Sequence, residues 1–476
     1  MKAPFSPYLA GIAPELKKFV SCLSARYDYV SVLSADSVGF AVRVSPHAKS
    51  VATETMTTER GSVVRVCRGG LYAEYSLNEF DPSHPDREAE RVAQALEEQY
   101  TLLDSLGVAP YETAVLPDEP ESIFAEMEAE RLPEEEDLPA LVTRLSALAE
   151  AAAKEHDLVD CSLSAQSTHI SKLFLTKNRD LRQSYVYSEA SCMPVGSEGD
   201  RTEMGYTGLS GRRGPELFDG IPEKLSEALS DLSDLLRSEP VVPGEYEIVC
   251  DPEVAGLIAH EAFGHGVEMD MFVKGRALGA EYIGRRVASD LVTMHEGANA
   301  CTQVASYAFD DEGTPAGDTV EIDRGILKTG VCDALSALRL HAAPTGNGKR
   351  ENFEHKVYTR MTNTLFAPGT HTPEEMIATV RHGYLLRGCE SGMEDPKHWG
   401  IQCIVQRGYE IRDGKLTGKV VAPVILTGYV PDLLCSISMA GSSAEAFGTG
   451  YCGKGTKEWV KVSDGGPYLK ARARLG

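Results

Sequence analysis

The chain of 476 residues is short of basic residues and of long apolar runs, and each shortage argues against a class of protein. Lys and Arg number 47 against 71 Asp and Glu, so a net charge of −24 repels phosphate backbones and anionic membrane surfaces. No run of about 18 uncharged apolar residues occurs, so no membrane-spanning helix is expected. We therefore expect neither direct nucleic-acid binding nor membrane insertion.

Paired cysteines and a signal peptide are also lacking. The amino terminus, MKAPFSPYLAG, has prolines where a signal peptide needs an apolar segment. The eleven cysteines are scattered, odd in number and free of any CxxC pair, which suits reduced thiols rather than a disulfide framework. These features predict a cytoplasmic protein whose cysteines are mostly small buried hydrophobes.

The length and the composition predict two globular domains. The chain is too long for one ordinary core, and 42% hydrophobic with 25% charged residues is normal for a globular protein. The stretch EPVVPGEY, 239–246, ends a helical pattern with two prolines and a glycine, which favours a domain boundary. We expect an N-terminal α+β domain over 1–240 and a C-terminal domain over 241–476.

The N-terminal half has strand patterns followed by helical ones. Between 27 and 77, four segments mix β-branched and aromatic residues with polar ones, which predicts short strands of an antiparallel sheet: YDYVSVLS, GFAVRVS, GSVVRVC and LYAEYSL. Helical spacing predicts packed helices over 81–107, closing at Gly107, over 138–156 and over 223–238. The acidic run 118–137, whose one basic residue is Arg131, is expected to be a solvated face or a linker.

The C-terminal half is mainly β in pattern. TVEIDRGILKTGVC and GYEIRDGKLTGKVV each place two short strands about a turn, at 324–325 and 413–414, which predicts two hairpins. HTPEEMIATV predicts one short helix with Thr372 as N-cap, Pro373 in the first turn and Glu375 completing a capping box. We expect a mainly antiparallel β domain that also carries a metal-binding helix.

The metal-binding helix is predicted from GLIAHEAFGHGVE, which holds His260, Glu261 and His265. Residues four apart on a helix differ by about 40° in direction, as in the familiar zinc-protease motif, whereas residues five apart differ by about 140°. A π-bulge or a helix end can realign the two imidazoles, and the glycines on both sides of His265 make that distortion easy. The two histidines can then share a metal ion, with Glu261 taking a proton from the activated water.

A catalytic zinc ion needs three protein ligands and one open position. Cys452, in GTGYCGKG, is the leading candidate for the third ligand, because glycines let its backbone approach and Lys454 nearby favours a thiolate. The other candidates are Glu268, His295 and His355. Glu268 also suits a hydrogen bond to the far nitrogen of His265.

The same residues could instead form a cysteine-nucleophile site or a structural zinc site. A Cys452 nucleophile would need an imidazole base and an oxyanion hole, and a structural zinc site is closed by four Cys or His ligands without an adjacent glutamate. Zinc ligation is preferred because it also accounts for the histidine pair, and a thiolate with two imidazoles favours Zn²⁺. PTGNGKREN, 344–352, is expected to be a turn or a flap over the substrate. RMTN, 360–363, could line the cleft, with its arginine binding a peptide carboxylate or making a surface ion pair.

Four blocks of sequence resemble the TldD/PmbA metallopeptidase family, also called modulators of DNA gyrase. They are YEIVCDPEVAGLIAHEAFGHGVEMD, DDEGTPAGDTVEIDRGILKTG, PTGNGKRENFEHKVYTRMTNTLFAPGTHTPEEMI and GYCGKG. They occur in the family's order and at about its distances, over most of 244–455. The N-terminal half resembles the family's first domain only in size and in its strand and helix pattern.

The resemblance implies a TldD-type zinc peptidase, in which His260, Glu261 and His265 match the family's motif and Cys452 matches its late cysteine. PmbA-type members lack the histidine motif and act as non-catalytic partners, so these residues imply the catalytic type. The family implies a homodimer, or a heterodimer with a motif-lacking PmbA-type relative. Two stretches, CGKGTKEW and RGCESGMEDPKHWG, depart from the family pattern. The resemblance therefore does not define the substrate or the partner, although the metal-binding positions are unchanged.

The expected function is zinc-dependent hydrolysis of amide bonds in unfolded or extended peptides, with Glu261 as general base. The peptide is expected to lie as an added strand beside a sheet edge. The alternative is a non-catalytic subunit that binds peptides or a partner and uses its metal ion for stability.

Overall fold

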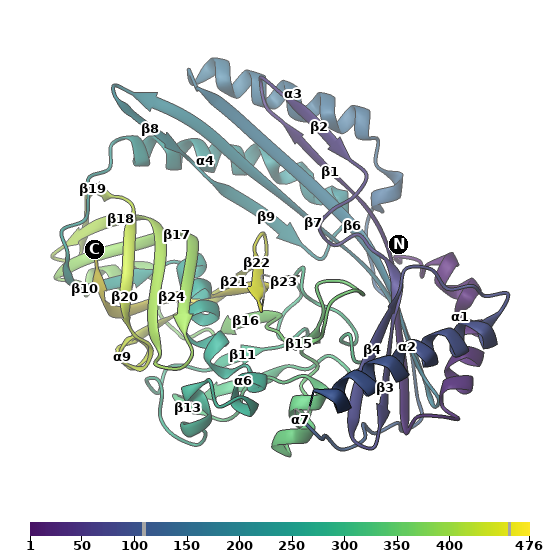
Figure 1. Cartoon of the computed structure of the whole chain (residues 1–476). Coiled ribbons are helices and arrows are strands. Elements are labelled where there is room, and N and C mark those ends of the chain that lie inside the picture. Colours follow the sequence, from purple (N-terminus) through teal and green to yellow (C-terminus); the bar gives the residue numbers. More distant parts are fainter. Residues whose placement is uncertain (107–110, 456–457) are drawn as a thin grey trace.

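The computed structural model describes residues 1–106, 111–455 and 458–476, which form two large β-sheets with flanking helices (Figure 1). Strands of the first sheet lie before residue 212 and strands of the second begin at residue 244, on either side of the predicted boundary at 239–246. The predicted α+β class is confirmed. The division into domains 1–240 and 241–476 stays a prediction.

The first sheet has the strand order β4-β3-β1-β6-β7-β5, and its pairs are antiparallel except β5 with β7. Three short strands lie off this path: β2 pairs with β1, and β8 and β9 pair with β7. The bounds are β1 Tyr29–Val44, β2 Lys49–Ala52, β3 Arg60–Arg68, β4 Leu71–Leu77, β5 Glu121–Glu126, β6 Asp160–Thr176, β7 Arg179–Glu198, β8 Arg201–Met204 and β9 Thr207–Gly211.

Two details of this sheet differ from the sequence prediction. YDYVSVLS and GFAVRVS form one strand, β1, because pairing with β6 continues through Gly39, where a Cβ atom would lie 2.6 Å from the Ser167 carbonyl oxygen. The glycine therefore allows a close approach between strands instead of ending one. The acidic run 118–137 is more than a solvated face or linker, because β5 within it pairs along β7 as an edge strand.

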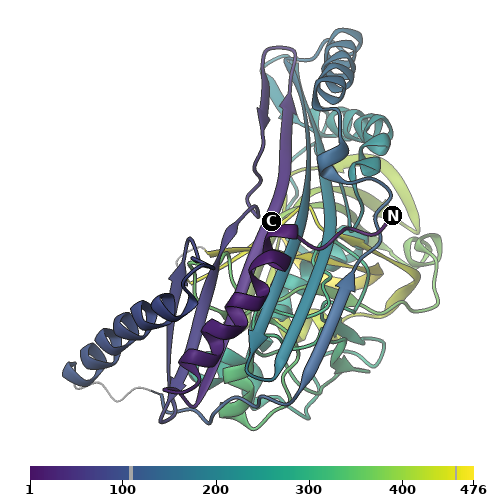
Figure 2. The same ribbon diagram turned by 90° about the vertical axis from the view of Figure 1, so that its right-hand side faces the viewer.

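Four long helices cover the first sheet: α1 Pro7–Leu23, α2 Pro85–Ser105, α3 Leu138–Glu155 and α4 Ile221–Leu236. Figure 2 shows α1 across one face of the sheet with the second sheet behind it, while α3 and α4 pack near the upper ends of β1, β6 and β7 (Figure 1). The three predicted helices are confirmed, although the predicted closing Gly107 lies outside the described residues. No helix in the described ranges combines the length and apolar character needed to cross a bilayer.

The second sheet closes on itself in part, because β10 pairs with both β17 and β24 and so completes a ring with β18 and β20. Its strands are β10 Gly244–Cys250, β11 Met294–Glu296, β12 Thr319–Asp323, β13 Ile326–Leu327, β16 Asn363–Phe366, β17 His382–Asp395, β18 Gly400–Arg412, β19 Lys415–Val421, β20 Val424–Tyr429, β21 Met439–Phe447 and β24 Ser463–Leu475. Most pairs are antiparallel, as predicted; β10 with β17 and β16 with β24 are parallel.

The two predicted hairpins and the predicted short helix of this half are confirmed. The hairpins β12–β13 and β18–β19 turn at Arg324-Gly325 and Asp413-Gly414, all with positive φ. Helix α8, Pro373–Ala378, begins with the predicted capping box. The remaining elements are α5 Pro252–Leu257, α6 Met269–Val273, α7 Ala334–Leu340, α9 Val430–Cys435, and two short ladders, β14 Gly348–Lys349 with β15 Tyr358–Thr359 and β22 Tyr451–Lys454 with β23 Glu458–Lys461.

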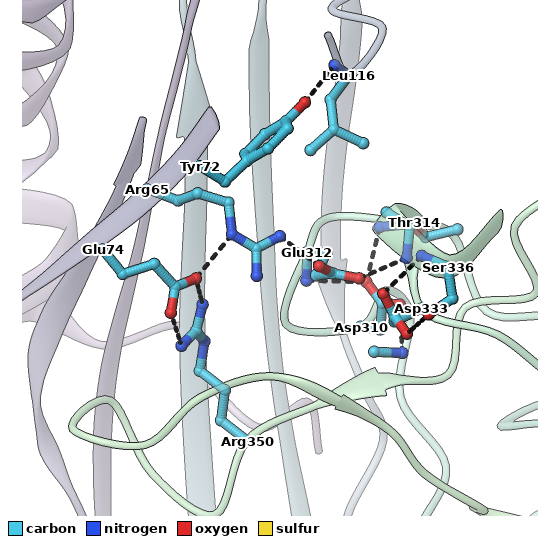
Figure 3. Close-up of polar contacts among 12 residues, drawn as sticks. Arg65, Tyr72, Glu74, Leu116, Asp310, Glu312, Thr314, Asp333, Ser336 and Arg350 are labelled. Atoms are coloured by element: carbon cyan, nitrogen blue, oxygen red, sulfur yellow. Dashed lines mark hydrogen bonds and ion pairs between the residues drawn. The ribbon is translucent and has the colours of Figure 1, made fainter. Parts of the chain in front are cut away.

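A buried ionic network joins the first sheet to the C-terminal half (Figure 3). Arg65 on β3 donates to Glu74 on β4 at 2.7 Å and also to Glu312. Arg350 donates to the same Glu74 carboxylate from the other side, at 3.0 Å. The side chains of Arg65, Glu312 and Arg350 are 8%, 1% and 4% exposed and that of Glu74 is 25% exposed, so the two cations are shielded from water and depend on their anionic partners.

Candidate metal centre

The helix that carries the predicted motif changes its pitch within the motif. Asp251 caps α5 by accepting a hydrogen bond from the Val254 N–H. After Leu257 the helix widens into a π-turn, η3 Ile258–Phe263, and then tightens into a 3₁₀ turn, η4 Gly264–Val267. The predicted wide turn is confirmed, and it brings the rings of His260 and His265 to a centroid separation of 5.2 Å.

The two glycines of the motif act through packing rather than through unusual dihedral angles. Gly264 has an ordinary helical φ of −57°. A Cβ atom on it would lie 2.2 Å from the sulfur of Met361, and a Cβ on Gly266 would lie 2.4 Å from Glu394 Oε1. A larger residue at either position would therefore have to displace a neighbouring side chain.

Cys452 reaches the two histidines from the β22–β23 hairpin, where it pairs with Val460. Its Sγ lies 3.4 Å from His265 Nε2. One potential ligand atom from each of His260, His265 and Cys452 lies within 4.8 Å of the others, and no other such group of three occurs in the part of the chain that the structure describes. The fold thus brings together residues that are 187 positions apart in the chain.

The electrostatics of these three side chains suit a cation. Burial raises the pKa of the Cys452 thiol, but His265 and His260 outweigh burial and hold the pKa well below its usual value. Burial lowers the pKa of His260, but the hydrogen bond to Cys452 and its charge outweigh that and raise the pKa to about 9. A thiolate therefore attracts protons onto the imidazoles, and a metal ion would take the place of those protons. His260 Nδ1 is buried with no hydrogen-bond partner in the described part of the chain, which leaves a nitrogen for a ligand.

Glu268 takes the position predicted for the partner of His265. Its Oε2 lies 3.1 Å from His265 Nδ1, on the side of the ring away from Cys452, and the residue is 2% exposed. Burial raises the pKa of Glu268, but Lys454 and His265 outweigh it and lower the pKa to about 2. Glu268 is therefore an anion that accepts the Nδ1 proton and leaves Nε2 free to bind a metal.

The other predicted neighbours lie elsewhere. His295 pairs with Asp318 at 2.8 Å, and His355 lies beside Glu351 and Glu458, so neither histidine joins the cluster. Lys454 was expected to favour the thiolate. Its ammonium instead donates to Asp270 at 2.7 Å and to the Thr359 carbonyl, and the low pKa of Cys452 comes from the imidazoles.

Arg360, from the RMTN stretch, binds the backbone of the β22–β23 hairpin that carries Cys452. It is 1% exposed and donates to the Cys452 carbonyl at 2.5 Å and to the Glu458 carbonyl at 3.0 Å, one on each strand. It is not among the residues that line the cleft and it is buried, so neither of the two suggested roles, binding a peptide carboxylate or making a surface ion pair, describes it. Glu189 on β7 pairs with Lys461 of the same hairpin, a contact that no sequence signal predicted.

A cleft of about 740 Å³ opens beside the three side chains. Glu261 lines it with its Oε2 3.9 Å from His265 Nε2, on the ligand side of that ring. Gly392 of β17 lies directly against Glu261, since a Cβ there would be 2.5 Å from Glu261 Cγ. Residues 389–394, part of the stretch that departs from the family pattern, form one wall.

Several known proteins are similar to this chain. A family model described as "PmbA/TldA metallopeptidase C-terminal domain" matches residues 243–473. A Haemophilus influenzae protein named "Metalloprotease TldD homolog" is 30% identical over 333 residues, which cover 67% of this chain and 68% of that protein. A metalloprotease of Methanocaldococcus jannaschii is 32% identical over 281 residues, which cover 59% of this chain and only 61% of that relative's length.

A solved structure has the same fold over nearly the whole chain. TldE from Thermococcus kodakarensis has a TM-score of 0.75 at 17% sequence identity, covering 97% of this chain and 100% of the other. At that identity the likeness concerns the fold alone. Because the Haemophilus relative is matched over two thirds of its length and the family model covers the metal-centre half, the chain belongs to the TldD/PmbA metallopeptidase family.

Proposed function

We propose that the chain is a zinc-dependent peptidase in which His260, His265 and Cys452 bind the metal and Glu261 is the general base. The observation that carries this proposal is the convergence of the three ligand atoms within 4.8 Å, with the Glu261 carboxylate beside them in an open cleft. Two imidazoles and a thiolate favour Zn²⁺ among divalent ions and leave one position for water or substrate. The metalloprotease names of the relatives support the same reading.

Each residue then has a defined task. A bound Zn²⁺ supplies Lewis-acid polarisation of the scissile carbonyl and acidifies water to a pKa of about 7. Glu261 accepts the proton of the attacking water and passes it to the leaving amine. Glu268 fixes the tautomer and the orientation of His265 through Nδ1.

We propose an extended peptide or unfolded protein as the substrate. Beyond Leu386, β17 no longer pairs with β10, and in the described ladders its residues 389–395 pair with β18 alone. That segment also lines the cleft, so a peptide can add its main chain there as a strand. A cytoplasmic dimer, either with a second copy or with a PmbA-type relative, completes the proposal.

Cys452→Ser should lower the zinc affinity of the purified chain by about tenfold to a hundredfold or more, because a hydroxyl replaces a thiolate ligand. Metal analysis after dialysis measures the effect, and hydrolysis of an extended peptide should fall with it. Cys435→Ser is the matched control, since Cys435 is an exposed thiol outside the cleft. Full zinc content in Cys452→Ser would remove this cysteine from the ligand set.

Gly392→Ala should slow hydrolysis at unchanged zinc content. The added methyl group would lie 2.5 Å from Glu261 Cγ and 2.7 Å from its Cβ, so it must displace the base and no metal ligand. Gly400→Ala is the control, because nothing lies within 4 Å of a Cβ at that position. Equal turnover by the two variants would show that the position of Glu261 does not limit the reaction.

A further inference from the structure

A second cavity lies between the first sheet and the cysteine hairpin. It has a volume of about 60 Å³ and is bounded by β6 and β7 on one side and by Lys349 and Lys461 of the C-terminal half on the other. Side chains alternate along a strand, so Trp459 and Lys461 point to the face of the hairpin opposite to Val460 and its partner Cys452. None of His260, His265 and Cys452 lines this cavity, although Trp459 lines both spaces and Val460, the pairing partner of Cys452, also borders the cavity.

Most charged groups around this cavity already have partners. The ion pairs are Lys172–Asp311, Lys461–Glu189 and Arg350–Glu74. Asp310 accepts three backbone N–H hydrogen bonds, and Glu351 lies beside His355. In the described chain, three lining groups, Lys349, Glu59 and Asp310, have no ionic partner within 4.0 Å, and of these Asp310 is already held by its backbone hydrogen bonds.

Lys349 presents its ammonium from the C-terminal side. It belongs to the segment 344–352, which does not cover the cleft as a flap but forms β14 and faces this cavity. Its Nζ donates to the Lys461 carbonyl at 2.6 Å and lies 5.8 Å from the centre of the Tyr307 ring. Burial and the charge of Arg360 lower the pKa of Lys349 to about 7, so the charged form lacks an anion.

Glu59 presents its carboxylate from the N-terminal side, just before β3. One oxygen accepts the Phe353 N–H at 2.8 Å, and no described residue donates to the other oxygen. Burial raises the pKa of Glu59, although Lys172, which is itself paired with Asp311, lowers it in part. The cavity therefore has unmatched charges of opposite sign on its two walls.

We propose that this cavity binds a small free α-amino acid as its zwitterion, with the carboxylate on Lys349 and the ammonium on Glu59. A lone anion would leave Glu59 unmatched and a lone cation would leave Lys349 unmatched, whereas a zwitterion can pair with both of these partly exposed groups. One water needs about 10–15 Å³, so a volume of about 60 Å³ admits glycine or alanine and excludes large side chains. Peptide hydrolysis at the neighbouring cleft would be one source of such a ligand, but the binding itself does not depend on zinc or on catalysis.

Calorimetric titration of the metal-free full-length chain with glycine tests the proposal. Wild-type protein should bind glycine, whereas acetate and methylamine, which each carry one of its charges, should bind at least about tenfold more weakly. Lys349→Met and Glu59→Gln should each weaken glycine binding about 10- to 100-fold, since each removes a charge-assisted hydrogen bond. The exposed neighbours Lys356 and Glu354 provide matched controls, Lys356→Met and Glu354→Gln, which should bind like wild type.

Three results would overturn the proposal: no heat of binding with glycine, equal binding of glycine and acetate, or wild-type affinity in both cavity variants. Thermal unfolding of the same samples provides a second readout, because a ligand that binds only the folded chain raises the midpoint with its concentration. That rise should be present in wild type and lost in Lys349→Met and in Glu59→Gln. All measurements use metal-free protein, so failure of the peptidase proposal would leave their outcome unchanged.

Discussion

Glu261→Gln should lower peptide hydrolysis by about 10²- to 10⁴-fold at unchanged zinc content and peptide affinity. The amide keeps the shape of the side chain but cannot accept a proton from water. Glu261 is suited to that role because its carboxylate is partly open to the cleft, at 22% exposure, and lies 3.9 Å from His265 Nε2. Initial rates on an extended peptide, with metal analysis and peptide binding on the same samples, measure the three quantities.

Glu281→Gln is the control for this experiment, because Glu281 is exposed and does not line the cleft. Hydrolysis at the wild-type rate in a clean Glu261→Gln preparation would remove this glutamate from the mechanism. A wild-type chain that binds zinc and peptide without turnover, alone and with a PmbA-type partner, would favour the alternative of a non-catalytic binding subunit. The two outcomes differ in the wild-type rate and are therefore distinguishable.

Glu74→Gln should destabilise the chain by about 3–5 kcal/mol, the usual cost of breaking a buried ion pair from one side. Glu74 receives hydrogen bonds from Arg65 at 2.7 Å and from Arg350 at 3.0 Å, and both guanidinium groups are almost fully buried. Among the described residues, the neutral amide would leave Arg65 with Glu312 as its remaining anionic partner (Figure 3), and Arg350 with the His355 carbonyl alone. Urea unfolding of variant and wild type measures the difference.

The same contact predicts a dependence of stability on acid. Burial raises the pKa of Glu74, but Arg65 and Arg350 outweigh it and lower the pKa from 4.5 to about 2. A depressed pKa stabilises the fold at pH values above the unfolded pKa, and this contribution, of the order of 3 kcal/mol, is lost as the pH falls from about 4.5 toward 2. Wild type should lose this contribution across that range, and Glu74→Gln should not.

Glu97→Gln is the matched control for both experiments. Glu97 pairs with Arg68 on the surface, where both side chains are about half exposed, and such pairs contribute about 0–1 kcal/mol. A Glu74 variant as stable as the Glu97 variant at neutral pH would show that the network adds little to stability. It would also remove the explanation offered for the acid dependence.

Elements governed by neighbouring residues were predicted well from the sequence. The capping box at Thr372, the Asp413-Gly414 turn and the π-turn at His260 all depend on contacts within a few positions. Two strand predictions were wrong because pairing with strands distant in the sequence determines the structure there. The sequence predicts a strand end near Gly39, but pairing with β6 continues through it. The sequence of the acidic run does not predict that part of it pairs with β7 as an edge strand.

For the metal centre, spacing and residue type already specified most of the chemistry. His265 follows His260 by five positions, so the two imidazoles can converge only through a wide turn. The imidazoles suit a metal ion, and the adjacent Glu261 suits a general base. Local pattern favoured Cys452 over Glu268, His295 and His355 but could not place its thiol, because ligand distances depend on how a hairpin nearly 190 residues away packs. Arg360 and Glu189 both contact that hairpin, and the contact of Glu189 on β7 forms only when the first sheet meets the C-terminal half.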